Sequence, residues 1–291
     1  MRIGVVFPQT EIGSDVGTIR DFARTVERAG YHHLAVYDHV LGHRPVDPES
    51  WSNIGPYTDK HSFHEVFVLL AYLAACTERI GLVTSVLILP QRQAVLVAKQ
   101  AAELQLLSGG RLRLGVGVGW NFEEYRALGM NFRDRGKRIS EQVKVMRMLW
   151  DDDLVTFQGL EHSINASGIN PRPSARIPVW IGGSAAVVIK RAATIGDGFM
   201  LDEDLEQAPV VLAHLQRELQ AVGRDPSAFG VAATLQLEQD GVDESVQRAA
   251  AWKAVGVSEL SVVTMDAGIS RPRDHAQLAL DFMHSWQSLK P

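Results

Sequence analysis

A carboxylate and an imidazole stand side by side after a short apolar segment near the N-terminus. The segment His33–Tyr37 is typical of a strand, and Asp38 and His39 follow it directly. At the carboxyl tip of a strand, this pair is well placed to transfer a proton or to hydrogen-bond a redox ring. A structural role is the alternative, in which Asp38 caps a turn and His39 only packs. The residues alone leave both interpretations open.

Two glycine-containing segments follow later strands. Gly117–Gly119 ends one of them, and its alternating glycines leave room for a flat ring or a phosphate, although they equally suit tight packing in a barrel. Gly182–Ser184 ends another strand and leads directly into a helical pattern. Free N–H groups and the positive end of the helix dipole favour an anion there, so this segment predicts a phosphate site. The alternative is an ordinary serine cap.

Polar residues also interrupt or follow the strands on either side. Thr84 and Ser85 break the apolar segment Ile80–Leu89, which indicates either a bulge near a ligand or two core hydroxyls bonded to neighbouring carbonyls. After the glycines of the next strand, Asn121 is expected to cap a helix. Glu123 and Glu124 follow, and we expect them to favour the positive end of that helix.

The elements that must position these residues alternate regularly. Short β-branched segments predict strands, and longer helical patterns separate them, which favours a (β/α)8 TIM barrel over an open doubly wound sheet. The predicted strands are Ile3–Phe7, His33–Tyr37, Ile80–Leu89, Leu112–Gly117, Pro178–Ile181, Gly198–Leu201, Gly230–Glu238 and Leu260–Thr264. We expect a single domain over residues 1–291, with a long loop at 41–62 that could close a site and an inserted hairpin at about 152–177.

Composition excludes several classes of protein. A net charge of −5 gives no reason to expect nucleic acid or an anionic membrane as partner. No apolar stretch is long enough for a membrane span or a signal peptide, so a cytoplasmic location is expected. The single cysteine, Cys76, excludes an intramolecular disulfide. The pairs His39/His43 and His61/His64 have metal-like spacing, but no further ligands complete them, and no metal site is expected.

One predicted helix is apolar on more than one face. It begins at Ala94 and carries Val95, Leu96 and Val97 in its first turn. A helix packed around a barrel needs only one buried face, so a second subunit is the simplest cover for the other, although the predicted helix from Phe63 could cover part of it. The sequence therefore predicts a homodimer.

Taken in order, these segments resemble the bacterial luciferase-like monooxygenase superfamily, and most closely its branch that depends on the deazaflavin coenzyme F-420. The resemblance is strong from Met1 to about Leu201. The residues that carry it are Thr84–Pro90, Lys99-Gln100, Leu107–Arg111, Leu114–Gly117, Pro178–Ser184, Ala192-Ala193 and Gly196–Gly198.

The resemblance implies roles for particular residues. Asp38 and His39 would lie beside the deazaflavin ring, with His39, oriented by Asp38, transferring the proton. Ser85-Val86 would be a non-prolyl cis peptide that presses on the back of the ring. The full set of implied cofactor-binding residues is Thr84, Ser85, Val86, Gly117, Val118, Gly119, Gly182, Gly183 and Ser184.

One residue departs from the family pattern. Trp120 stands where the sugar-phosphate-oxidising branch has an acidic proton donor, so oxidation of a sugar phosphate is not expected. An apolar substrate pocket that includes Trp120, Trp51 and Tyr57 is expected instead. We predict hydride transfer between F-420 and a small organic substrate. The alternatives are an FMN-dependent monooxygenase that uses reduced flavin and oxygen, and a flavin-binding protein without turnover whose mouth those aromatic residues fill.

Overall fold

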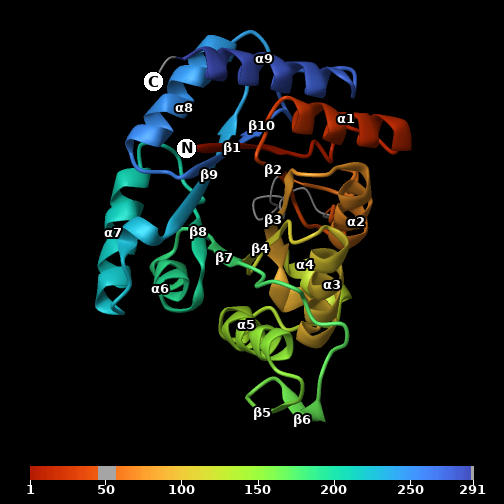
Figure 1. The fold of residues 1–291 in the computed structure, drawn as a ribbon, viewed down its shortest axis with the longest axis vertical. Helices are drawn as coiled ribbons and strands as arrows, with labels where there is room; N and C mark the ends of the chain where they lie inside the picture. Colours follow the sequence, from red (N-terminus) through yellow and green to blue (C-terminus); the bar gives the residue numbers. More distant parts are fainter. Residues whose placement is uncertain (45–56, 290–291) are drawn as a thin grey trace.

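The computed structural model describes residues 1–44 and 57–289, and these form a closed barrel of parallel strands with helices around it (Figure 1). Around the barrel the order is β1-β10-β9-β8-β7-β4-β3-β2. The (β/α)8 barrel predicted from the alternation of elements is therefore confirmed. The barrel strands are β1 Arg2–Val6, β2 His33–Val36, β3 Gly81–Ile88, β4 Leu112–Gly117, β7 Val179–Gly182, β8 Gly198–Met200, β9 Gly230–Gln236 and β10 Glu259–Val263.

Helices cover the outside of the barrel, and the longer ones bury apolar side chains. In the first of them, the side chain of Asp15 accepts a hydrogen bond from the N–H of Thr18 at 2.7 Å, and the buried stripe runs from Ile19 to Val26. None of the described helices is both long and apolar enough to cross a bilayer. The helices are α1 Val16–Arg28, α2 Val66–Cys76, α3 Ala94–Leu107, α4 Phe122–Ala127, α5 Arg135–Asp151, α6 Ala186–Ile195, α7 Ala208–Ala221, α8 Val242–Ala254 and α9 Asp274–Ser288, with short 3-10 turns η2 Leu89–Gln91 and η3 Pro226–Ala228.

Two segments extend the barrel. Between α5 and β7 lies a two-stranded antiparallel hairpin, β5 Val155–Gln158 and β6 Ser163–Ser167, within the range where a hairpin was predicted. Glu141 of α5 holds its turn by accepting the N–H groups of residues 160–162. The predicted loop at 41–62 is described at its two ends only, and Trp51 lies outside the described residues.

The interior of the barrel differs between its two ends. At the amino-terminal end, Glu259 pairs with Arg113 at 2.6 Å and with His33 at 3.4 Å, and Arg113 stacks over Trp180 at 4.2 Å. Burial lowers the pKa of His33 to about 3, so its ring is neutral. Toward the carboxyl end the interior is apolar, with Tyr37 and Val86 packed on a cluster that includes Val6, Ala35, Val83, Trp180, Met200, Ala232, Val263 and Met265.

Candidate active site

The side chains singled out in the sequence gather at the carboxyl ends of β2, β3 and β4. These strands are neighbours in the barrel, so the segments that follow them meet at one side of its mouth. His39 follows β2, and η2 follows β3. Asn121 caps α4 after β4, as predicted, with its side-chain oxygen 3.2 Å from the N–H of Glu124.

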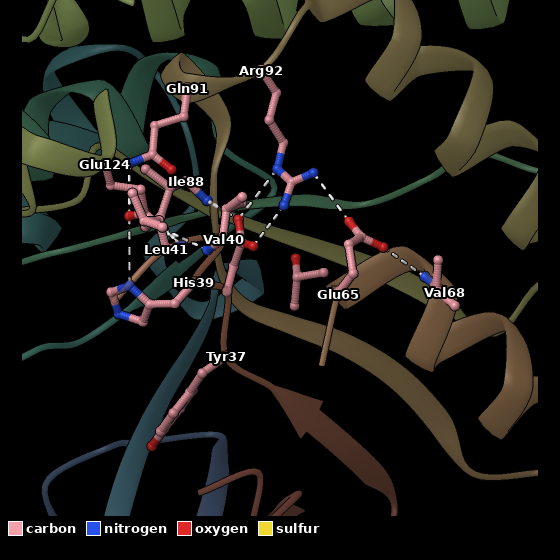
Figure 2. Close-up of polar contacts among 12 residues, drawn as sticks. Tyr37, His39, Val40, Leu41, Glu65, Val68, Ile88, Gln91, Arg92 and Glu124 are labelled. Atoms are coloured by element: carbon pink, nitrogen blue, oxygen red, sulfur yellow. Dashed lines mark hydrogen bonds and ion pairs between the residues drawn. The ribbon is translucent and has the colours of Figure 1, made fainter. Parts of the chain in front are cut away.

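The carboxylate in contact with His39 is Glu124. The Nδ1 atom of His39 lies 3.5 Å from Oε2 of Glu124, and Gln91 donates to the same oxygen at 2.9 Å (Figure 2). The other oxygen of Glu124 accepts the N–H groups of Val40 and Leu41. The side chain of His39 is 11% exposed and that of Glu124 is 1% exposed. One buried carboxylate therefore holds both the imidazole and the chain that leaves β2.

These contacts keep Glu124 ionised. Burial opposes the charge of its carboxylate, but hydrogen bonds from His39, Gln91 and the two backbone N–H groups outweigh burial and lower its pKa. With an anion next to Nδ1, a proton on that nitrogen is favoured, and the neutral ring then presents the lone pair of Nε2.

Asp38 has a different partner, which corrects the expectation that it orients His39. Its carboxylate accepts two hydrogen bonds from Arg92, at 2.6 and 3.3 Å, and one from the N–H of Ile88 at 2.9 Å. Arg92 also reaches Glu65 at 3.1 Å, and Glu65 caps α2 through the N–H of Val68 (Figure 2). Asp38 thus joins β2 to the segment after β3 and to α2.

The ion pairs with Asp38 and Glu65 keep Arg92 positively charged. Burial disfavours its cation, but Asp38 and Glu65 outweigh burial and raise the pKa of Arg92. Burial raises the pKa of Asp38, while Arg92 and the N–H of Ile88 act against that rise. Asp38 fixes the backbone from which His39 projects, and it does so without touching the imidazole.

Aromatic rings surround His39. The ring centroids of Phe63, Tyr57 and Trp120 lie 4.9, 5.2 and 5.4 Å from that of His39. Tyr57 and Trp120 were predicted for the substrate pocket, whereas Phe63 was not singled out. Trp120 remains 37% exposed, so the described part of this wall is apolar and faces the mouth.

The polar interruption of β3 is a bulge. The pairing of β3 with β4 shifts between Thr84 and Leu87, and the Ser85-Val86 peptide is cis, as the family resemblance implied. A Cβ added at Gly117 would lie 2.5 Å from one methyl of Val86, and a Cβ added at Gly182 would lie 2.6 Å from the other. The glycines of β4 and β7 therefore make room for Val86.

Thr84 is fully buried, and its hydroxyl donates to the carbonyl oxygen of Gly115 at 2.7 Å. This contact fits the alternative of a core hydroxyl bonded to a neighbouring carbonyl, and a part for Thr84 in cofactor binding stays a prediction. Ser85 and Val86 are half-buried. Val118 is half-buried as well, and Gly119 has a positive φ of 64°.

The start of α6 is open toward solvent. Ala185, not Ser184, is the N-cap residue, and no side chain caps the helix. Among the described residues, no hydrogen bond uses the N–H groups of residues 184–187, although Gly183 donates to Met200 at 3.1 Å. The alternative of a serine cap is therefore not what the structure shows. A phosphate could accept N–H groups here, from Ser184 onward.

Sequence reasoning did not single out Arg92 and Gln91, and it gave Glu124 only a place at the positive end of its helix. Glu124 stands three residues after the cap Asn121, a spacing that predicts a carboxylate turned back on its own helix. Arg92 and Gln91 lie just after β3, which is a position where barrels carry functional residues. No group of three or more potential metal ligands occurs within 1–44 and 57–289.

The fold and these motifs define a class of protein. The sequence model of the luciferase-like monooxygenase family matches residues 1–281, and the chain belongs to this family. It is accordingly an oxidoreductase or monooxygenase.

Three relatives are similar to this chain in sequence over more than half of its length. An uncharacterized protein of Mycobacterium tuberculosis is 32% identical over 255 residues, which cover 82% of this chain and 88% of that protein. An F-420-dependent glucose-6-phosphate dehydrogenase of Kineococcus radiotolerans is 32% identical over 216 residues, or 72% of this chain and 60% of the relative. The pyrimidine monooxygenase RutA of Allorhizobium ampelinum is 34% identical over 175 residues, or 57% of this chain and 47% of the relative.

A solved structure agrees with the fold over the full length. An F-420-dependent secondary alcohol dehydrogenase in complex with an F-420–acetone adduct has a TM-score of 0.81 and 16% sequence identity, covering 100% of this chain and 99% of that one. At this identity the likeness concerns the barrel alone.

Proposed function

We propose that this chain transfers a hydride between coenzyme F-420 and a small, uncharged organic substrate at the carboxyl mouth of the barrel. The observation that carries the proposal is the buried His39–Glu124 pair beside the Ser85-Val86 bulge. A relative that is 32% identical over 72% of the chain is an F-420-dependent dehydrogenase, which supports the cofactor.

The residues present fit such a cofactor. Val86 offers an apolar surface at the mouth, and glycines occupy the positions where other side chains would collide with it. The uncapped start of α6 offers N–H groups for a phosphate, with the Ser184 hydroxyl beside them. When bound, F-420 supplies a ring carbon that gives or takes a hydride.

His39 is the residue of this chain that would transfer the proton. Because Nδ1 of His39 is held by Glu124, its Nε2 is left to face the substrate. During oxidation of an alcohol, Nε2 would take the hydroxyl proton as the hydride leaves the same carbinol group. During reduction of a carbonyl, it would return that proton to the oxygen. Glu124 stabilises the imidazolium that forms, and the aromatic wall excludes water.

The substrate is expected to be uncharged. Among the described residues, the charged group in contact with His39 is the anion Glu124, and the other neighbours of the ring are aromatic. A phosphorylated substrate would meet no cation at this position. Small alcohols, carbonyls and activated alkenes are the expected classes.

The second candidate function is that of an FMN-dependent monooxygenase. A relative that is a pyrimidine monooxygenase favours it, and the same bulge and helix start would suit FMN. The aromatic rings around His39 favour a third candidate, a flavin-binding protein without turnover, since they already cover much of the imidazole.

Titration of the purified protein with F-420 and with FMN, followed by fluorescence quenching, tests the proposal. Tight binding of F-420 and weak binding of FMN is expected. His39→Ala should then abolish turnover of an alcohol or enone with little change in melting temperature. Preference for FMN would move the assignment to a monooxygenase, and unchanged turnover in His39→Ala would remove the proton-transfer role.

We also propose that the protein is a cytoplasmic homodimer. On the outer faces of α2 and α3, Val68, Leu96 and Leu107 are each more than half exposed. These apolar side chains are suited to contact with a second copy of the chain. Light scattering should give twice the monomer mass, and Leu96→Glu should shift the protein toward the monomer.

A further inference from the structure

One tyrosine at the mouth has no part in the chemistry assigned so far. Tyr37 is the first residue after β2, two positions before His39, and its ring packs on the apolar cluster inside the carboxyl end of the barrel. Figure 2 shows Tyr37 extending away from the His39–Glu124 network. It therefore reaches a different part of the mouth from the one that His39 lines.

The ring of Tyr37 lies inside the barrel, because it packs on a cluster formed by residues of β1, β2, β3, β7, β8, β9 and β10. Burial raises the pKa of Tyr37, and the nearby Tyr57 and Asp202 raise it further. The phenol is therefore protonated, and it can donate a hydrogen bond.

That donor has no acceptor within the described part of the chain. No hydrogen bond of the Tyr37 hydroxyl occurs among residues 1–44 and 57–289, and the ring is half-buried. A second donor belongs to Gln9, which contacts the backbone of Tyr37. Gln9 is fully buried and accepts the backbone N–H of Tyr37 at 2.7 Å, but its own Nε2 has no partner among the described residues. A buried donor without a partner, such as this Nε2, is uncommon in native proteins and is expected where a ligand completes the site.

Tyr37 also shares its surface with the bulge. Tyr37 and Val86 are the two half-buried side chains that pack on the same interior cluster. In the proposed function Val86 backs the cofactor ring, so Tyr37 belongs to the same interior surface as the residue beneath that ring.

We propose that Tyr37 is a cofactor-contacting residue whose hydroxyl donates a hydrogen bond to a carbonyl oxygen of the bound ring, with Gln9 fixing the backbone that carries it. The inference rests on the proposed function, because it requires a flavin-type ring at the mouth. Deazaflavin and flavin both carry ring carbonyls, so the contact is expected with F-420 and with FMN alike.

Tyr37→Phe removes the hydroxyl and keeps the ring. Titrations with F-420 and FMN should show Kd raised about five- to tenfold for whichever cofactor the wild type binds, which is the effect of one lost hydrogen bond. The melting temperature should stay within about 1 °C of the wild type, because no hydrogen bond within the described chain is lost. The matched control is Tyr72→Phe on α2, whose hydroxyl meets the carbonyl of Val16 on the outer surface. It should change neither quantity.

A second readout does not depend on affinity. In protein labelled with 3-fluorotyrosine, the fluorine resonance that disappears in Tyr37→Phe should shift when F-420 is added, while that of Tyr72 should not. A Kd changed less than twofold with no shift of the Tyr37 resonance would overturn the inference and leave the proposed function standing. A wild type that binds neither cofactor would overturn both.

Discussion

Replacing Glu124 by Gln tests the arrangement on which the candidate site depends. The substitution keeps the size of the side chain and removes its charge. One oxygen remains to accept the N–H groups of Val40 and Leu41. The new amide NH₂ faces His39 and Gln91, where a carboxylate oxygen had accepted.

The cost follows from these contacts. Gln91 can adapt, because its own Oε1 has no partner among the described residues and an amide flip would offer that oxygen to the new NH₂. What cannot be recovered is the charge, and a hydrogen bond to a charged group contributes about 1.5–3 kcal/mol. For 291 residues the entropy of unfolding is about 0.6 kcal/mol/K. A loss of about 2 kcal/mol should therefore lower the melting temperature by about 3 °C.

The effect should depend on pH in a defined direction. The pKa of Glu124 is lowered in the folded protein, so its charge stabilises the fold at pH above the ordinary carboxyl value of 4.5. That stabilisation is lost as the pH falls through the lowered folded-state pKa. The gap between wild type and Glu124→Gln should thus be full at pH 7 and narrow below pH 4.5.

Thermal unfolding followed by circular dichroism, across a pH series, measures both effects. Glu123→Gln is the control, since Glu123 lies next to Glu124 on α4 and makes a surface ion pair with Arg126 at 3.6 Å. It should shift the melting temperature by less than about 1 °C. An unchanged melting temperature in Glu124→Gln, or a gap as wide at the acid end of the series as at pH 7, would refute the reasoning.

Three further substitutions probe the rest of the site. Arg92→Met leaves the buried carboxylate of Asp38 without its cation and should cost about 3–5 kcal/mol, seen as a fall in melting temperature of at least about 5 °C; a fall of only a degree would contradict a buried ion pair. Gly117→Ala places a methyl against Val86 and should cost about 1–3 kcal/mol in urea unfolding. Adding Val86→Ala should recover much of that loss, and simple additivity of the two would count against the contact. Thr84→Val removes a buried hydroxyl bond and should cost about 1 kcal/mol in the same assay, with affinity for F-420 unchanged.

The sequence was sufficient to predict the barrel and the position of its mouth. The alternation of strands and helices can be recognised from short segments of sequence. Eight strand–helix units in one chain favour a closed barrel. The polar interruption of β3 at Thr84 and Ser85 and the cap at Asn121 could likewise be identified, since each depends on a short segment, although the interruption left a bulge and a pair of core hydroxyls as alternatives. The resemblance to a family then located the cis peptide, which no local pattern of residue types predicts.

The partners of the two polar side chains at the tip of β2 could not be predicted. Asp38 and His39 are adjacent in the sequence, which suggested that one orients the other. Neighbours along an extended chain point to opposite sides, so adjacency separates them. Asp38 meets Arg92 from 54 positions away. Glu124 meets the backbone of Val40 from 84 positions away. Such contacts depend on the closed fold, which brings the ends of β2, β3 and β4 together.

The mouth of the barrel has two kinds of position, which are glycines packed close to the β3 bulge and aromatic residues at the rim. Gly115, Gly117 and Gly182 each lack room for even one added carbon, because its position would fall within 2.6 Å of Thr84 or Val86 atoms. The rings of Phe63 and Trp120 face no such limit at the rim. Random mutagenesis should therefore return functional variants at the rim and almost none at the three glycines. A barrel built in this way can change its rim residues over evolutionary time while the glycines around the β3 bulge stay the same.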